Sequence, residues 1–222
     1  MSVILAVPPH PDDETLGCGG TLLRAIAAGA EVHWLIATQM NAALGAAEER
    51  LAHRQQEIEQ VAEAYGFASV HQAPFLAARL DTVPTGDFVG WIGGIVRSVQ
   101  PDTLYLPFRD DVHSDHAATF DAAAACTKSF RYPSVKRVYA YETLSETEFA
   151  LRPGRRGFQP NRFVDISPWL ERKIEIMQIY KGEIGQHPFP RSVDAIRALG
   201  VYRGLVAGVQ AAEAFTVLRE IE

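Results

Sequence analysis

The sequence predicts an α/β fold, a Rossmann-like and mostly parallel sheet flanked by helices on both faces, formed as a single domain over residues 1–222. Short apolar runs alternate with longer amphipathic stretches along most of the chain. This alternation is typical of parallel strands joined by crossover helices. Glycines stand where two of the predicted helices end, as expected at a helix C-terminus. A length of 222 residues suits one such domain and is too short for two of full size.

The elements follow one another regularly up to Glu142. Val3–Val7 is predicted as a buried strand, and Leu16–Ala28 as a helix that Gly29 ends. Glu48–Tyr65 carries apolar residues at helical spacing and is followed by Gly66. The other predicted elements of this part are the strands Val32–Thr38, Val70–Ala73, Thr103–Pro107 and Arg137–Tyr141 and the helices Phe88–Val99 and Ser114–Cys126.

The pattern is less regular beyond Glu142. The elements predicted here are a strand at Phe163–Ile166, a helix at Trp169–Tyr180, a loop at Gly182–Arg191 and a helix at Ser192–Ala212. The loop follows from its two prolines. Periodicity leaves Ala214–Ile221 open between a last strand and a helix end.

Composition limits the class of protein. The net charge is −6 and no basic stripe is present, so we expect no nucleic-acid partner, although one or two arginines suffice for a phosphate-bearing small molecule. The sequence contains no run of eighteen apolar residues, so we expect no membrane span. The apolar residues at the beginning of the sequence are not preceded by the basic region of a signal peptide. Two cysteines form no disulfide framework, so we expect a cytoplasmic protein. The oligomeric state stays open.

Two polar clusters each follow a buried strand and precede a helix. The first is His10-Pro11-Asp12-Asp13-Glu14, and the second runs from Asp110 to His116. Ligands of open parallel sheets bind at the carboxyl ends of strands where the strand order reverses. In the common order 3-2-1-4-5, the first and fourth strands flank that reversal. We therefore expect the two clusters to face each other across one crevice.

The residue types in these clusters suit a catalytic zinc site. His113 and His116 are three residues apart, as are His10 and Asp13, so a helical start places each pair on one face. Catalytic zinc takes three protein ligands such as two histidines and a carboxylate, and leaves a position for water. One carboxylate and one histidine then remain as a base and an oxyanion donor. The alternative is that the aspartates cap a helix and the histidines are surface residues.

The stretches "PHPDDETLGCGGTL" and "DVHSDH" resemble the zinc-dependent LmbE-like family, related to the N-acetylglucosaminyl-phosphatidylinositol de-N-acetylases. The later segments "HRQQE", "NRFVDISPWLERKIEIMQIY", "HPFPRS" and "AAEAF" are similar to further signatures of that family. One departure is visible, since relatives commonly have serine before the glutamate where this chain has Lys181-Gly182-Glu183.

The resemblance implies roles for residues at matching positions. It makes His10, Asp13 and His116 the zinc ligands and Asp12 the general base. It also implies that His113 faces the substrate carbonyl as a protonated donor, that Asp115 orients His113 through its ring N–H, and that Arg54 lies in the substrate pocket.

Two further arginines are candidates for substrate binding. Arg109 either contacts substrate or pairs with Asp110 or Asp111. Arg191 either holds an anionic group beside the pocket or belongs to a turn after Pro190.

The motifs and the resemblance together predict a metal-dependent hydrolase that removes an acetyl group from an N-acylated amino sugar such as an N-acetylglucosamine derivative. We expect one Zn²⁺ per chain, with Fe²⁺ or Co²⁺ as possible substitutes. A Mg²⁺-dependent phosphohydrolase and a non-catalytic sugar- or metal-binding module are the alternatives. Nucleotide-, lipid- and thiol-linked sugars all remain open as substrates.

Overall fold

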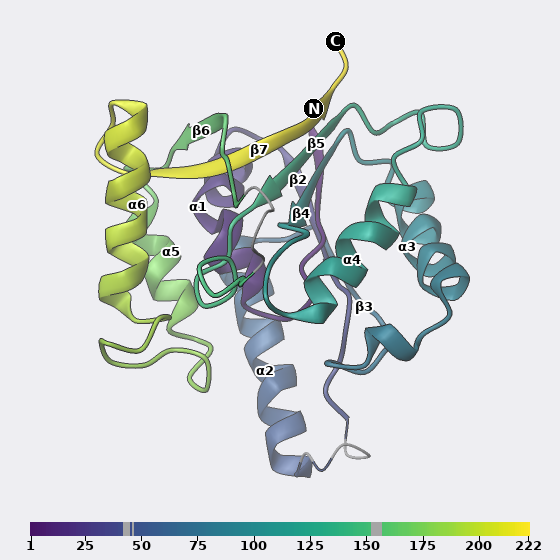
Figure 1. Ribbon diagram of the computed structural model, residues 1–222, viewed down its shortest axis with the longest axis horizontal. Coiled ribbons are helices and arrows are strands. Elements are labelled where there is room, and N and C mark those ends of the chain that lie inside the picture. Colours follow the sequence, from purple (N-terminus) through teal and green to yellow (C-terminus); the bar gives the residue numbers. More distant parts are fainter. Residues whose placement is uncertain (42–44, 46, 152–156) are drawn as a thin grey trace.

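A twisted sheet forms the centre of the molecule (Figure 1). The structure is a computed structural model that describes residues 1–41, 45, 47–151 and 157–222. Within these residues the sheet has seven strands in the order β3-β2-β1-β4-β5-β7-β6. β1 to β5 run parallel, and β7 is antiparallel to both β5 and β6. The strands are β1 (Val3–Ala6), β2 (Glu31–Ile36), β3 (Ser69–Gln72), β4 (Thr103–Pro107), β5 (Arg137–Tyr141), β6 (Arg162–Asp165) and β7 (Ala212–Glu220).

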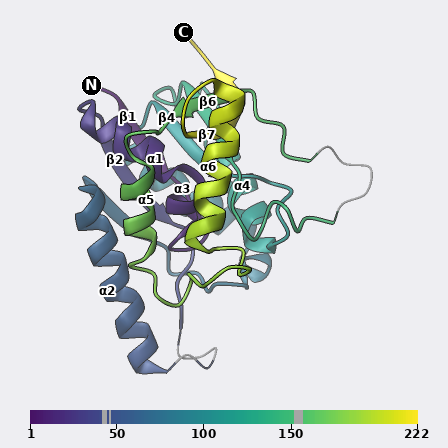
Figure 2. The same ribbon diagram turned by 90° about the vertical axis from the view of Figure 1, so that its left-hand side faces the viewer.

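Helices cover both faces of the sheet, which confirms the predicted fold class. One face packs against α1 (Asp13–Ala27), α2 (Glu48–Tyr65), α5 (Leu170–Met177) and α6 (Val193–Ala207). The other packs against α3 (Thr85–Val99) and α4 (Ser114–Ala125), with a short 3₁₀ helix, η2 (Leu80–Thr82). Figure 2 shows α5 and α6 side by side over the first face. In β1, Ile4 and Ala6 join one core while Leu5 joins the other, as strand alternation requires.

Several elements differ from prediction at their ends. α3 begins at Thr85 instead of Phe88 and α5 ends at Met177 instead of Tyr180, and two further differences bear on the site and on the last strand. α1 begins at Asp13, three residues before the predicted Leu16, because its first turn is acidic rather than apolar. Asp13 and Glu14 therefore belong to the helix. α6 ends at Ala207, where Gly208 takes a left-handed φ of 71°. The predicted extension of this helix to Ala212 is wrong, and the segment left open after it is the strand β7.

Close packing sets the position of α1 over the sheet. A Cβ at Gly17 would lie 2.1 Å from Cδ2 of Tyr141, and one at Gly20 would lie 2.8 Å from Ile166. No side chain fits at either place, so the glycines let the helix approach the strands. The first turn of α1, which carries Asp13, is thereby held at the carboxyl end of β1.

A buried ion pair fastens α1 to the C-terminal part of the chain. Lys173 of α5 donates from Nζ to Glu213 Oε1 of β7 at 2.7 Å. Glu213 also accepts the backbone N–H groups of Gly20 and Thr21 at 2.8 and 2.7 Å. One carboxylate thus connects α1, α5 and β7.

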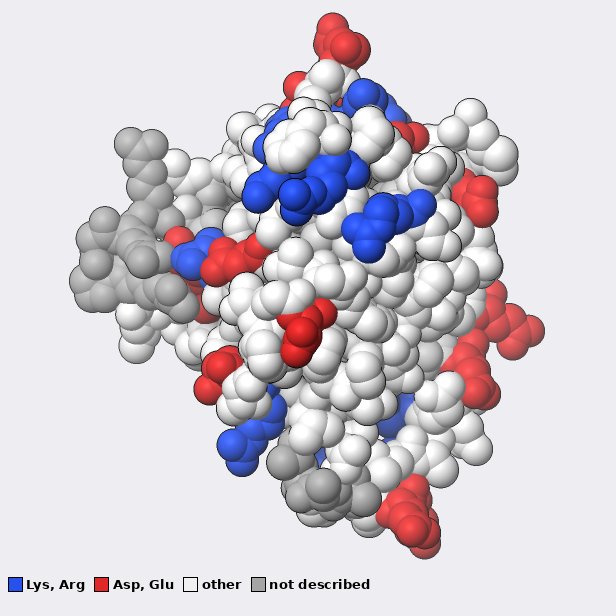
Figure 3. All heavy atoms as spheres, turned by 90° about the vertical axis from the view of Figure 1, so that its right-hand side faces the viewer, with Lys and Arg blue, Asp and Glu red and all other residues white. Residues whose placement is uncertain are grey.

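The face formed by α3 and α4 carries scattered charges (Figure 3). Lys and Arg side chains gather on it toward the end where the C-terminus lies, and acidic side chains lie mostly around its margin. No helix in the described part of the chain is long and apolar enough to cross a membrane.

Candidate active site

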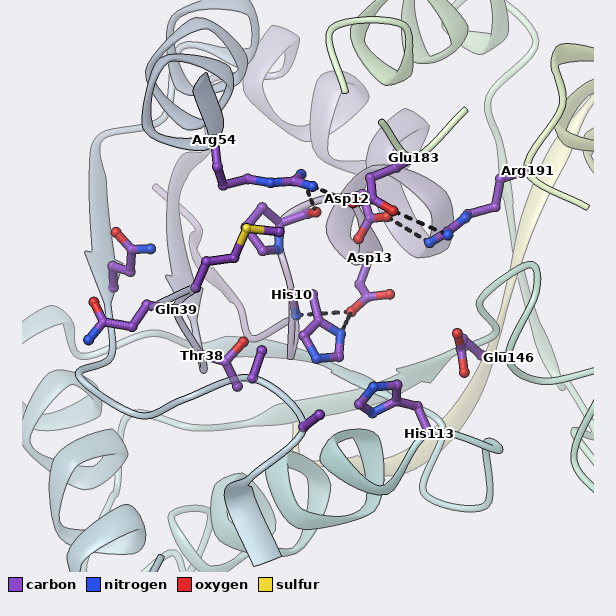
Figure 4. A pocket seen from close by; sticks show the side chains of 15 residues that line it. His10, Asp12, Asp13, Thr38, Gln39, Arg54, His113, Glu146, Glu183 and Arg191 are labelled. Atoms are coloured by element: carbon purple, nitrogen blue, oxygen red, sulfur yellow. Dashed lines mark hydrogen bonds and ion pairs between the residues drawn. The ribbon is translucent and has the colours of Figure 1, made fainter. Parts of the chain in front are cut away.

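A cavity of about 280 Å³ opens at the carboxyl ends of the parallel strands, beside the junction of β1 and β4. Its walls come from the loop after β1, the segment after β2, helix α2, the start of α4 and the loops after β5 and α5 (Figure 4). Among its lining residues are His10, Asp12, Asp13, Arg54, His113, Glu146, Glu183 and Arg191. The two polar clusters therefore meet across one crevice, as the predicted strand order requires.

His10, Asp13 and His116 offer three ligand atoms to one point. Oδ2 of Asp13 lies 3.2 Å from Nδ1 of His10 and 3.4 Å from Nε2 of His116. These three atoms lie within the separation that a single metal ion can bridge. Nε2 of His116 is buried and has no hydrogen-bond partner among the described residues. Such an unsatisfied ring nitrogen is costly unless something binds it, so the donor set fits a divalent metal that prefers imidazole and carboxylate.

A carboxylate lies behind each of these two imidazoles. Asp115 Oδ2 is 2.9 Å from His10 Nε2, and Asp111 Oδ2 is 2.7 Å from His116 Nδ1. Both carboxylates are fully buried. Each accepts a ring N–H, so that the opposite nitrogen of a neutral ring would be available to a metal ion beside Asp13.

The predicted partnership of Asp115 with His113 needs correction. Oδ2 of Asp115 lies 3.9 Å from Nδ1 of His113, beyond hydrogen-bond distance. It is used instead by His10 and by the backbone N–H of Ala78 at 2.6 Å. Asp115 therefore orients His10, because the start of α4 directs its carboxylate across the crevice toward β1.

His10, His113 and Asp115 form a second group with metal-like spacing. In this group the Asp115 oxygen and the His10 Nε2 are already hydrogen-bonded to each other. The group with the unsatisfied His116 nitrogen is the better candidate.

The charges of the cluster favour a bound cation. Burial opposes protonation of His10, but its hydrogen bonds with Asp115 and Asp13 outweigh burial and raise its pKa to about 9. Burial opposes protonation of His116 too, but the charge of Asp13 and the interactions with Asp111 together outweigh it and raise the pKa to about 10. Burial alone would raise the pKa of Asp13, yet the two imidazoles hold it well below its usual range. The carboxylates thus favour nearby positive charge, which a metal ion supplies without protons.

Asp12 stands at the N-cap position of α1, but its side chain does not cap the helix. Its carboxylate makes no cap hydrogen bond, and Oδ2 instead accepts from Arg191 Nη1 at 3.1 Å. Its backbone takes a φ of 126°, which is unusual for a residue with a side chain. Glu14 supports this conformation, because its Oε2 accepts the Asp12 N–H at 3.1 Å. Burial, followed by the charge of Asp13, raises the pKa of Asp12 well above its usual range.

His113 forms the N-cap of α4 through its side chain. Nδ1 accepts the backbone N–H of Asp115 at 3.1 Å. That nitrogen is therefore unprotonated, and Nε2 carries the ring hydrogen. Burial and the neighbouring His10 also lower the pKa of His113. The expected protonated imidazolium is thus replaced by a neutral ring that keeps one N–H for donation into the cavity.

Arg54 and Arg191 line the cavity on either side of Glu183 (Figure 4). Arg54 is buried in α2, where it pairs with Glu183 and lies 3.3 Å from Glu57. Arg191 contacts Glu183 at 3.2 Å as well as Asp12. Two cations and two carboxylates thus alternate along the cavity wall.

Arg109 does not line this cavity. Its guanidinium makes a two-pronged contact with Asp121 on the surface, at 2.6 and 2.8 Å. Arg109 also forms an ion pair with Asp110 at 3.7 Å, one of the two partners expected for it. A role in substrate binding is not supported by this position.

Four acidic residues of the site were not assigned a role from the sequence. Asp111 and Glu14 stand inside the two motifs, so their position carried a signal, but their contacts depend on ring and backbone geometry. Glu146 and Glu183 come from loops without periodicity. Glu146 lines the cavity, its Oε2 is buried without a hydrogen bond, and burial raises its pKa.

Comparisons with known proteins agree with the motifs. The family described as PIG-L: GlcNAc-PI de-N-acetylase matches residues 5–127. Diacetylchitobiose deacetylase of Thermococcus kodakarensis is 23% identical over 217 residues, covering 95% of this chain and 80% of that protein. A conserved protein of Thermus thermophilus superimposes with a TM-score of 0.79 and 26% identity, over 100% of this chain and 97% of the other.

A third neighbour has a different activity. The 4-carboxy-2-hydroxymuconate hydratase of Pseudomonas putida superimposes with a TM-score of 0.74 and 19% identity, over 100% of this chain and 98% of that one. This likeness shows the fold alone, and a shared fold does not fix the reaction.

Proposed function

We propose that this chain, which belongs to the PIG-L: GlcNAc-PI de-N-acetylase family, is a zinc-dependent hydrolase that removes the N-acetyl group from an amino sugar such as an N-acetylglucosamine derivative. The observation that carries the proposal is the unsatisfied, buried Nε2 of His116, 3.4 Å from Asp13 and in one group with His10. Beside this group stands Asp12, a carboxylate that no helix cap uses.

His10, Asp13 and His116 would hold the zinc through Nδ1, Oδ2 and Nε2. When bound, zinc supplies a Lewis acid that polarises an amide carbonyl and lowers the pKa of a coordinated water. Asp111 and Asp115 keep the two imidazoles in the tautomers that ligation needs.

Asp12 is proposed as the general base. Its raised pKa makes it a better proton acceptor than an ordinary aspartate. In the structure its Oδ2 pairs with Arg191, so the arginine positions the carboxylate and limits how far its pKa rises. After taking a proton from water, Asp12 can pass it to the departing amine, which is a poor leaving group until protonated.

His113 is proposed to stabilise the oxyanion of the tetrahedral intermediate. The N–H on Nε2 is fixed by the hydrogen bond that Nδ1 accepts. A preorganised neutral donor suffices for this role, since the developing negative charge strengthens the hydrogen bond.

The wall formed by Arg54, Glu183 and Arg191 is proposed to bind the sugar. Alternating guanidinium and carboxylate groups offer both donors and acceptors, which matches the hydroxyl groups of a carbohydrate. The same arginines could hold an anionic substituent of the sugar.

The test is turnover of a panel of N-acetylated sugars by the zinc-loaded protein, read by the release of primary amine and of acetate. N-acetylglucosamine, diacetylchitobiose and N-acetylglucosamine 1-phosphate cover plain, β-linked and anionic sugars. We expect equal amounts of amine and acetate from at least one of them, and none from the Asp12→Asn variant.

The rival functions give different results in the same assay. A Mg²⁺-dependent phosphohydrolase would release phosphate from the third substrate and no acetate. A binding module would bind a sugar without releasing either product. A hydratase would act on an unsaturated carboxylic acid and leave every amide intact. Any of these outcomes would overturn the proposal.

A further inference from the structure

A second cavity lies at the amino ends of the parallel strands, opposite the ends that carry the candidate active site. Its volume is about 460 Å³, and it is bounded by the amino ends of β1, β4 and β5, the last turns of α1, the strand β6 and the end of β7. In Figure 1 this is the end of the molecule near both chain termini. None of the residues proposed for catalysis lines it.

Positive charge dominates the walls of this cavity. Three arginines, Arg24, Arg137 and Arg162, line it against one carboxylate, Glu220. Arg137 is already paired with Asp102 at 2.8 Å. Glu220 accepts the Tyr139 hydroxyl at 3.3 Å. The chain has a net charge of −6, so a cluster of guanidinium groups is unexpected unless negative charge neutralises it.

Two of these arginines have no ion pair with a carboxylate among the described residues. Arg24 is exposed and donates to the backbone carbonyl of Asp165 at 3.0 Å, whereas Arg162 is partly buried. Its guanidinium lies over the ring of Tyr139, 4.1 Å from the ring centre. Its Nε is buried and has no hydrogen-bond partner in the part of the chain that the structure describes. Within the described residues no carboxylate lies at ion-pair distance from it. The ring of Tyr139 holds the guanidinium by a cation–π contact, and the two terminal Nη groups can then donate to an oxyanion.

Two hydroxyl groups reinforce the same wall. Thr21 is 5% exposed, lines the cavity, and its buried Oγ1 has no hydrogen-bond partner. Tyr105 is 3% exposed and also lines the cavity, and its hydroxyl makes no hydrogen bond to any described residue. Water could satisfy the hydroxyls, whereas an anion would also neutralise the partly buried guanidinium of Arg162.

We propose that this cavity is a binding site for a small anionic molecule, one that presents a phosphate or carboxylate group to Arg162 and Tyr105. Phosphate and carboxylate share the planar pair of acceptor oxygens that a guanidinium edge recognises. The site is separate from the proposed deacetylase centre and does not depend on it.

The experiment uses two anion probes on the intact protein. Crystals soaked in selenate locate the tetrahedral oxyanion by the anomalous signal of selenium, and calorimetric titration with inorganic phosphate and with citrate measures affinity. We expect selenium in the cavity at the Arg162 guanidinium. We also expect saturable binding of at least one solution probe, weakened on the order of tenfold or more in Arg162→Gln, the size of a lost charge-assisted pair.

Two further variants separate recognition from folding. Arg162→Lys keeps the charge but loses the flat, stacked fork, so we expect an affinity between wild type and Arg162→Gln. Arg109→Gln removes an arginine that pairs with Asp121 outside the cavity, so its titration should match wild type. Thermal unfolding of each variant checks that the fold is retained.

The proposal is overturned if selenium appears only in the candidate active site or nowhere. It is equally overturned if wild type and Arg162→Gln give the same titration curve, or if Arg109→Gln weakens binding as much as Arg162→Gln does.

Discussion

Asp12 and Asp13 are adjacent in the chain, yet their carboxylates face different partners. Asp13 approaches His10 and His116, whereas Asp12 contacts Arg191. Asp12→Asn keeps the shape and removes the basicity. We expect it to retain zinc and to lose roughly a hundredfold to ten-thousandfold in kcat, the range for a missing general base. Metal content by elemental analysis and kcat by acetate release are the two measurements.

Asp13→Ala is the matched comparison for Asp12→Asn. It removes one of three ligand atoms, so we expect weaker zinc binding, with activity partly restored by excess Zn²⁺. Zinc lost from Asp12→Asn but kept by Asp13→Ala would show that the two roles are exchanged.

His113 offers a test of the neutral-donor interpretation. His113→Ala should retain zinc and reduce kcat on the order of a hundredfold to a thousandfold, the usual effect of a lost oxyanion donor. His113→Gln should lose less, because its amide N–H₂ is a neutral donor of similar reach. Single-turnover acetate release by the two variants makes the comparison. Equal loss in both would instead favour a charged imidazolium.

At the scale of elements, the buried pair of Lys173 and Glu213 connects α5 and β7 to the middle of α1. Lys173→Met fills similar space but leaves the Glu213 carboxylate without its cation. We expect a loss of about 3–5 kcal/mol in the free energy of unfolding, the usual cost of breaking a buried pair from one side. Urea denaturation measures it.

The double variant Lys173→Met with Glu213→Gln is the control. Its glutamine can still accept one backbone N–H from α1 and carries no charge, so it should recover part of the lost stability. A single variant as stable as wild type would mean that solvent reaches the pair.

The β2–β3 edge contains two histidines whose pKa values are lowered. Burial is the main cause for both His33 and His71, and the charge of His33 adds to the effect on His71. The hydroxyl of Ser69 lies between the rings, 2.7 Å from each. The unfolded chain therefore binds protons that the folded edge resists, so these residues reduce stability as the pH falls below the ordinary value of 6.5.

We expect the urea midpoint to fall less between about pH 7.5 and about pH 5.5 in the double variant His33→Gln with His71→Gln than in wild type. Carboxylates titrate equally in both proteins, so the difference between the two curves isolates the histidines. Parallel curves would show that neither histidine resists protonation in the folded state.

For the molecule as a whole, the parallel part of the sheet was predictable because its strands are continuous apolar runs. The short polar strand β3 is an exception, and the reversal between β1 and β4 was expected from the strand order that is common in such sheets. The C-terminal strand β7 was not predictable from the sequence, because its first residues are buried while its last residues are exposed. Its antiparallel place between β5 and β6 depends on pairing that no local pattern encodes.

The candidate active site also has a part that the sequence predicts and a part that it does not. Residue types and topology were enough to bring the two motifs together. The partners of the rings were not predictable, because a shift of one ring decides whether Asp115 contacts His10 or His113. Glu146 and Glu183 lie in loops, where the sequence has no period to follow.

The two outermost strands of the sheet, β3 and β6, have four residues each. An outer strand exposes unpaired backbone groups that can recruit a strand from another molecule, and a short one offers few. β6 also begins with Arg162 and ends with Asp165, and charges at an edge oppose such recruitment. The sheet is therefore protected against growing from chain to chain, and any association of folded copies would have to use helices or loops instead.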